Sequence, residues 1–77
     1  MNKPTRKQLQ TLIDNLEILK EKLEEISEEE QEKLDNTPEN LQGSERYERA
    51  EEICGYLEEA LDSFEDLIEH ITNAIEE

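Results

Sequence analysis

The spacing of the apolar residues constrains this chain more than any other feature. From Leu9 the large apolar side chains advance by alternate steps of three and four, and this row comprises Leu9, Leu12, Leu16, Leu19, Leu23 and Ile26, with Ile13 widening it at the N-terminal end. Such spacing is typical of the contact seam of a coiled-coil helix and differs from the two-residue alternation of a strand. We therefore expect a helix over about residues 5–35, with a capping box from Thr5 to Gln8.

A second and longer run of the same spacing fills the C-terminal half of the chain. Its members are Tyr47, Ala50, Cys54, Leu57, Leu61, Phe64, Ile68, Ile71 and Ile75, and a row beside it contains Ile53, Ala60, Leu67 and Ala74 at steps of seven. Three apolar residues per heptad make a face as wide as that of a helix in a globular bundle. We expect a second helix over about residues 45–76, with Ser44 as its N-cap.

The connector, residues 36–44, contains the signals of a short helical turn. Thr37 before Pro38 resembles a helix start and Gly43 a helix end, so we expect one turn from Pro38 to Gln42, with Leu41 beneath the hairpin. If the chain folds back near residue 40, facing residues have numbers that sum to about 80, and every large seam residue meets a large partner. The sequence therefore predicts one all-α domain, residues 1–77, folded as an antiparallel helical hairpin.

Composition limits how much this hairpin can bury. The 77 residues include 23 acidic and 8 basic side chains, for a net charge of −15, and only 32% are hydrophobic. A single core in a chain of this size rarely supplies more than a few kcal/mol. A lone hairpin also leaves part of the wide face of the second helix exposed. We therefore expect a homodimer that forms a four-helix bundle; a monomeric hairpin and larger or mixed assemblies are the alternatives.

Charge and composition also exclude several classes of protein. The single cysteine, Cys54, cannot form an internal disulfide and is expected to be a small buried apolar side chain. No apolar run has the length of a signal-peptide core or of a membrane span. The strong negative charge repels nucleic acid and anionic lipid alike. We expect a cytoplasmic protein that binds neither nucleic acid nor membranes directly.

No residues in the sequence form a convincing catalytic, metal or cofactor site. The only histidine, His70, follows Asp66 by one helical turn, but both lie off the seam, so a solvated polar surface is the simpler interpretation. Glu30 is the one carboxylate at a seam position, and Arg46 or Arg49 is expected to keep it ionised as a structural ion pair rather than as a catalytic acid. The sequence therefore predicts a protein that is not an enzyme and needs no cofactor or metal.

The surface supplies the remaining candidate site. The first helix carries carboxylates that repel one another at i, i+4 spacing, namely Glu21, Glu24, Glu25, Glu28, Glu29 and Glu32. Either they form an ordinary solvated face or they were selected for negative potential. Ile18 and Tyr56 project away from the seams, and they are either scattered exposed side chains or anchors for a partner protein. We take these eight residues as candidate partner-binding residues.

One segment resembles known proteins. Residues 36–48 read Asn-Thr-Pro-Glu-Asn-Leu-Gln-Gly-Ser-Glu-Arg-Tyr-Glu and lie between two acidic heptad helices. This arrangement resembles small acidic helical proteins of unknown function encoded by bacteriophages and prophages of Gram-positive bacteria. The resemblance implies a short accessory phage protein that acts on a host protein in the cytoplasm of the host bacterium, and it transfers no functional residues.

The function that the sequence predicts is therefore binding of another protein through charge. A dimer would carry −30, close to the linear charge density of DNA over the length of a 30-residue helix. The specific hypothesis is a phage-encoded inhibitor of a host defence protein that acts by charge or nucleic-acid mimicry on a basic nucleic-acid-binding surface. The alternative is a structural or assembly coiled coil whose acidic surface serves only solubility.

Overall fold

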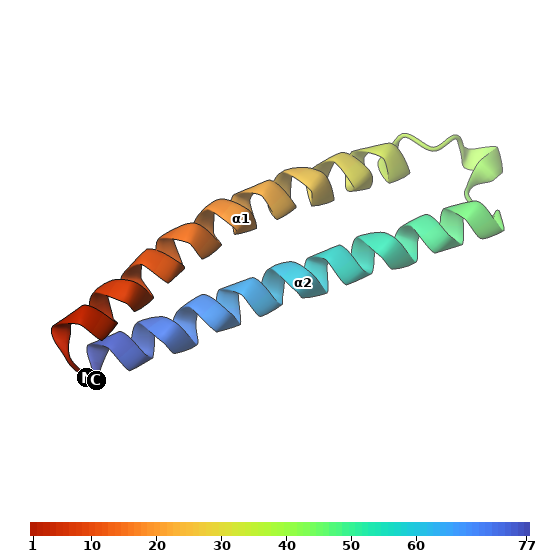
Figure 1. Cartoon of the computed structure of the whole chain (residues 1–77). Coiled ribbons are helices and arrows are strands. Elements are labelled where there is room, and N and C mark those ends of the chain that lie inside the picture. Colours follow the sequence, from red (N-terminus) through yellow and green to blue (C-terminus); the bar gives the residue numbers. More distant parts are fainter.

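The computed structural model describes all 77 residues as two long antiparallel helices joined by a short connector (Figure 1). Helix α1 spans Lys3–Asp35, the short 3-10 helix η1 spans Glu39–Leu41, and α2 spans Glu45–Glu76. The two helices lie side by side, with both ends of the chain together at the open end of the hairpin. The molecule extends 59 × 16 × 13 Å. The all-helical hairpin predicted from the heptad spacing is confirmed.

The helix ends are set by local hydrogen bonds. At the start of α2, Ser44 is the N-cap as predicted, and its side-chain oxygen accepts a hydrogen bond from the backbone N–H of Tyr47 at 3.2 Å. At the start of α1, the Asn2 side chain accepts from the backbone N–H of Thr5 at 2.9 Å. The helix therefore begins at Lys3, and the prediction of a capping box that starts at Thr5 is wrong. Asparagine caps a helix at least as well as threonine, and Pro4 fits the first turn.

The connector differs from the expected turn. The helical segment is Glu39–Leu41 and Pro38 precedes it, so it is shorter than Pro38 to Gln42. Leu41 is 50% exposed rather than packed beneath the hairpin. Thr37 does not cap η1, because its hydroxyl donates to the Lys33 carbonyl at 3.2 Å and so completes the end of α1. The Ser44 hydroxyl donates to the Leu41 carbonyl at 2.8 Å. Hydrogen bonds, rather than a buried leucine, therefore support the turn.

The face that α1 turns toward α2 also differs from the predicted seam. Its least exposed residues are Ile13, Ser27 and Leu34, at 5%, 9% and 8%. The half-buried residues that complete this row include Leu9, Leu16, Lys20, Leu23 and Glu30. In contrast, Leu12, Leu19 and Ile26 are 45%, 50% and 52% exposed. The prediction that these three face α2 is wrong, because α1 is turned about its axis by about 50°, half the angle between successive residues.

The register of the two helices, that is, which residues face each other, also differs from the prediction. Lys20 lies against Glu65, with 3.1 Å between Nζ and Oε1, and the Glu30 carboxylate is close enough to Cys54 to act on its thiol. Facing residues therefore have numbers that sum to about 84, one helical turn away from the expected 80. The rotation brings Ile13 into the seam and lets Lys20 extend its amino group to the edge. The seam of α2 is as predicted, with Cys54 6% exposed and Leu57, Leu61 and Ile68 half-buried.

Candidate protein-interaction surface

The seam is flanked by two long faces that have unlike chemistry. A two-fold axis normal to the plane of an antiparallel hairpin relates its helices, so residues at equivalent heptad positions lie on the same face. The seam uses two positions of each heptad. Residues that precede the first of these positions, such as Leu19 before Lys20 or Ile53 before Cys54, therefore share one face. Residues that follow the second of these positions, such as Glu24 after Leu23, share the other face.

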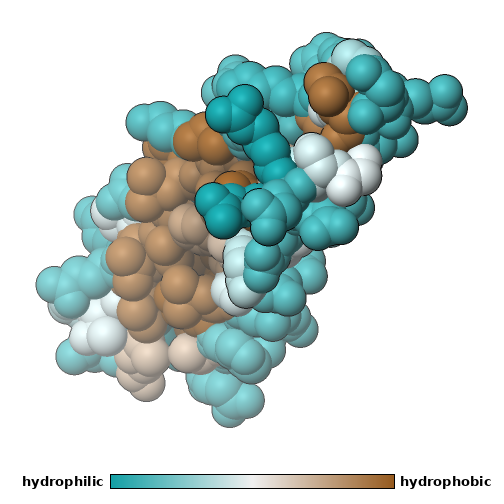
Figure 2. Space-filling view, turned by 90° about the vertical axis from the view of Figure 1, so that its right-hand side faces the viewer, coloured by the Kyte–Doolittle hydropathy of each residue, from teal (hydrophilic) through white to brown (hydrophobic).

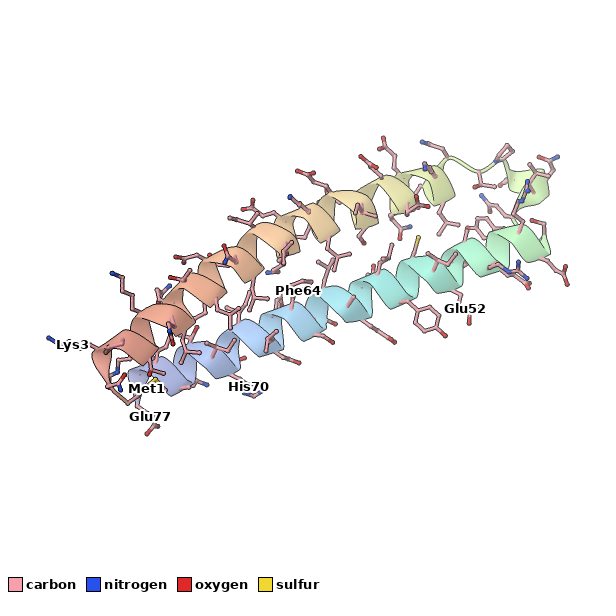
Figure 3. All side chains as sticks on the ribbon, in the orientation of Figure 1. Met1, Lys3, Glu52, Phe64, His70 and Glu77 are labelled. Carbon is pink, nitrogen blue, oxygen red and sulfur yellow. The ribbon has the colours of Figure 1, made fainter.

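The first of these faces is apolar. It consists of Leu12, Leu19 and Ile26 from α1 and of Ile53, Ala60 and Leu67 from α2, and we call it the apolar face. Each of its five large side chains is 45% to 52% exposed. Figure 2 shows apolar residues gathered in one broad area of the hairpin surface. A shallow hollow lined by Ala60, Ser63, Phe64 and Leu67 indents the α2 half of this face. Phe64 itself points toward α1, whereas Glu52 and His70 point away from it (Figure 3).

The second face is acidic. It consists of Asp14, Glu17, Glu21, Glu24 and Glu28 from α1 and of Glu51, Glu58, Asp62, Glu65 and Glu69 from α2, and we call it the acidic face. Lys20 joins its two halves, with Nζ 3.6 Å from Glu24 Oε1 and 3.1 Å from Glu65 Oε1. The hydrogen bond to Glu65, followed by the nearby charges, holds the pKa of Lys20 above its usual 10.5. One cation therefore bridges the helices among ten carboxylates.

The predicted acidic run does not form a single surface. Glu21, Glu24 and Glu28 lie on the acidic face, whereas Glu25 and Glu32 lie on the outer side of α1, opposite the seam. Glu29 lies on the remaining flank, beside the apolar face. The five carboxylates of α2 in the acidic face were missed because they are not consecutive in sequence. Their signal is a step of seven, as in Glu51, Glu58 and Glu65.

The two exposed apolar candidates lie apart. Ile18 is 54% exposed on the outer side of α1, and Tyr56 is 61% exposed on α2. The Tyr56 hydroxyl donates to Glu52 Oε1 at 3.4 Å, one turn back along the same helix. Tyr56 also lies within one turn of Ile53 and Ala60, so it borders the apolar face. These two residues therefore do not form one anchor site.

The expected ion pair of Glu30 with Arg46 or Arg49 is wrong. Glu30 Oε1 instead accepts from Lys33 Nζ at 3.2 Å, three residues along the same helix. The register shift explains the difference, because it places Glu30 against Cys54. Burial raises the pKa of the Cys54 thiol above 9.0, and the Glu30 carboxylate raises it further. The thiol is therefore protonated at neutral pH, a state in which it is a poor nucleophile.

The structure contains no group of three His, Cys, Asp or Glu side chains arranged to hold a metal ion. Neither long helix contains an apolar stretch that could cross a membrane. Comparison with protein-family models, with curated proteins and with solved structures finds no match to this chain. The distinguishing features of the surface are thus the apolar face and the acidic face.

Proposed function

We propose that this chain is a non-enzymatic protein-interaction module that dimerises into a four-helix bundle and binds a basic protein surface through its acidic faces. Its setting would be that of a small phage-encoded inhibitor in the host cytoplasm, and its target a host defence protein whose basic cleft binds nucleic acid. The observation that carries the proposal is the acidic face, in which ten carboxylates come from both helices and two of them, Glu24 and Glu65, lie against Lys20.

The charge density of the proposed dimer supports nucleic-acid mimicry. Two chains of −15 give −30, and the hairpin is 59 Å long. Duplex DNA carries one charge per ~1.7 Å, which gives about 35 charges over the same length. A basic cleft that accepts a duplex would therefore meet a rod of similar charge.

The low number of ion pairs also supports a role for the acid beyond stability. The chain has 23 acidic residues, and its only ion pairs join Lys20 to Glu24 and Glu65 and Lys33 to Glu30. Like charges at i, i+4 spacing destabilise a helix by about 0.2–0.5 kcal/mol per pair. An acidic surface that served the fold alone would interleave lysines with the carboxylates.

Two matched variants test the proposal. The first, the acidic-face variant, carries Glu17→Gln, Glu21→Gln, Glu51→Gln and Glu58→Gln. The second, the outer-side variant, carries Glu25→Gln, Glu32→Gln, Glu52→Gln and Glu59→Gln. Each removes two charges from α1 and two from α2, and glutamine keeps the helix propensity of glutamate. Each is titrated against an arginine-rich DNA-binding peptide that is bound to a short fluorescent duplex.

The chain is expected to displace the duplex, and displacement should weaken steeply with salt because exposed charges are screened. Exposed ion pairs contribute roughly 0.2–1 kcal/mol each, so the acidic-face variant should need about tenfold more protein, and the outer-side variant should need much less than that. Equal loss in both variants would contradict a specific acidic face. No loss in either would favour the alternative, in which the acid serves only solubility of a structural coiled coil. Tyr56→Ala is a further control, and a loss of binding there alone would favour an apolar anchor.

A further inference from the structure

We infer that the apolar face packs against the apolar face of a second copy of this chain, with the two hairpins antiparallel. Each connector then lies beside the open end of the other hairpin, and the two acidic faces point in opposite directions. This inference rests on the dimer of the proposed function. It adds the surface that forms the dimer, the orientation of its two chains and the number of acidic faces that it presents.

The side of the hairpin that carries the apolar face has the size of a protein–protein interface. Single exposed leucines are common on proteins, but a contiguous apolar surface marks a site of association. The whole side of the hairpin that carries the apolar face spans 59 × 16 Å, or roughly 900 Å², and the apolar side chains lie in its middle part; stable interfaces bury about 800 Å² on each partner. An identical two-helix face matches this surface in both length and width.

The distribution of charge restricts how two copies can meet. Each chain carries −15, and none of the ten carboxylates of the acidic face lies on the apolar face. Contact through the acidic faces or the outer sides would bring carboxylates of the two copies together. Contact through the apolar faces keeps both acidic faces in solvent, on opposite sides of the bundle.

The cations beside the apolar face indicate the orientation. Lys33 and Arg46 continue its two rows toward the connector, and Arg49 lies next to them. Arg46 and Arg49 have no ion-pair partner in the hairpin. If both connectors lay at one end of the bundle, these cations of the two copies would crowd together. The antiparallel arrangement instead separates the cations of the two copies by the length of the bundle.

The same arrangement covers the exposed apolar residues of α1 with apolar residues of the second copy. Leu19 lies near the middle of α1, which spans Lys3–Asp35. Leu19 therefore meets Leu19 of the second copy near the two-fold axis, and Leu12 meets Ile26. On α2 the hollow beside Ala60 and Ser63 is open to side chains of the second copy. One dimer thus presents two equivalent acidic faces and is built to engage two basic surfaces.

Disulfide cross-linking tests the orientation. Single cysteines are introduced into a chain that carries Cys54→Ala, or Cys54→Val should alanine reduce helicity. Leu19→Cys is expected to give a disulfide-linked dimer for most of the chains on mild oxidation. Ile18→Cys is the matched control, because this neighbouring residue is 54% exposed, against 50% for Leu19, and lies on the outer side. It should cross-link at least tenfold less.

The other arrangement predicts a different cross-link. If the connectors lay at the same end, Leu19 would face Leu67 of the second copy, so a mixture of Leu19→Cys chains and Leu67→Cys chains would cross-link and Leu19→Cys alone would not. That result, with a dimeric mass in sedimentation, overturns the orientation and leaves the bundle intact. A dimer with no cross-link in either sample overturns the assignment of the apolar face. A monomer at micromolar concentration overturns the dimer of the proposed function as well.

Discussion

The two faces that flank the seam are built from neighbouring heptad positions and yet have opposite chemistry. Leu19 precedes a seam residue and is half exposed beside Ile26 and Leu12, whereas Glu24 follows a seam residue and lies among carboxylates of both helices. The hairpin uses neither face for its own core, which consists of the seam between them. We propose that the two faces serve separate contacts, one with a second copy and one with a basic target.

This comparison also explains why the apolar pattern of the sequence is wider than the hairpin needs. Only four residues of the chain are buried, and three of them are apolar. The apolar row of α1 and the step-of-seven row of α2 together supply one seam and one exposed face. A hairpin of this length that lacked the second face would have no apolar surface left for association.

The largest effect is expected from a charge on the apolar face. In the parent dimer, burying the half-exposed Leu19 of each copy contributes roughly 1 kcal/mol to the free energy of dimerisation. Leu19→Glu removes this contribution from both copies, and dimerisation would also have to desolvate the new carboxylates. The dissociation constant of the dimer should rise at least about 100-fold, as measured by sedimentation equilibrium. The control is Ile18→Glu, which makes the same change of charge one residue away and should leave the dimer intact. If both variants dimerise equally well, the apolar face is not the interface.

Neutralising the acidic face should stabilise the hairpin. The acidic-face variant removes several like-charge pairs at i, i+3 and i+4, each destabilising by about 0.2–0.5 kcal/mol, so the free energy of unfolding should rise by about 1–2 kcal/mol. Urea unfolding at low salt measures this gain, and at about 1 M salt most of it should disappear because the charges are screened. A variant that is less stable than the parent chain would mean that these carboxylates make stabilising contacts.

A smaller gain is expected from Gly55→Ala. Gly55 lies within α2 on the acidic side, and a Cβ atom built there meets no atom within 4 Å apart from the glycine, its chain neighbours and the adjoining backbone of α2. Alanine should therefore raise the free energy of unfolding by up to about 1 kcal/mol, through the lower backbone entropy of the unfolded chain. The opposite change on the apolar face, Ala60→Gly, should lower stability by at least as much. Loss of stability in Gly55→Ala would reveal a close backbone contact at this position in the dimer.

The smallest effect concerns Cys54 and alkaline pH. Because burial raises the pKa of its thiol, the folded chain holds the thiol proton more tightly than the unfolded chain does. The resulting stabilisation is complete below an unfolded pKa of about 8.5 and is lost as pH rises through the folded pKa. Melting temperatures measured from pH 7.5 upward should therefore fall more steeply for the parent chain than for Cys54→Ala. Parallel curves would show that the thiol does not contribute to the pH dependence.

The secondary structure and the seam of α2 followed from the sequence because both depend on local information. Three-four spacing over four heptads requires a helix with one apolar side, whatever lies opposite. Ser44 caps α2 through its own side chain, which needs no tertiary partner. The start of α1 was misplaced by two residues because Asn2 and Thr5 are both acceptable caps, and their sequence pattern alone does not decide between them.

The two faces were decided only by tertiary structure. In α1 the apolar residues cover so wide an arc that two rotations leave an apolar seam, one with Leu12, Leu19 and Ile26 inside and one with Ile13 and Leu34 inside. The second rotation places Lys20 in the seam, where its amino group lies 3.1 Å from Glu65 of α2. That contact joins residues 45 positions apart, so no local pattern contains it. The sequence by itself determined two amphipathic helices and their total charge, and the long-range packing determined which leucines stayed outside and which carboxylates came together.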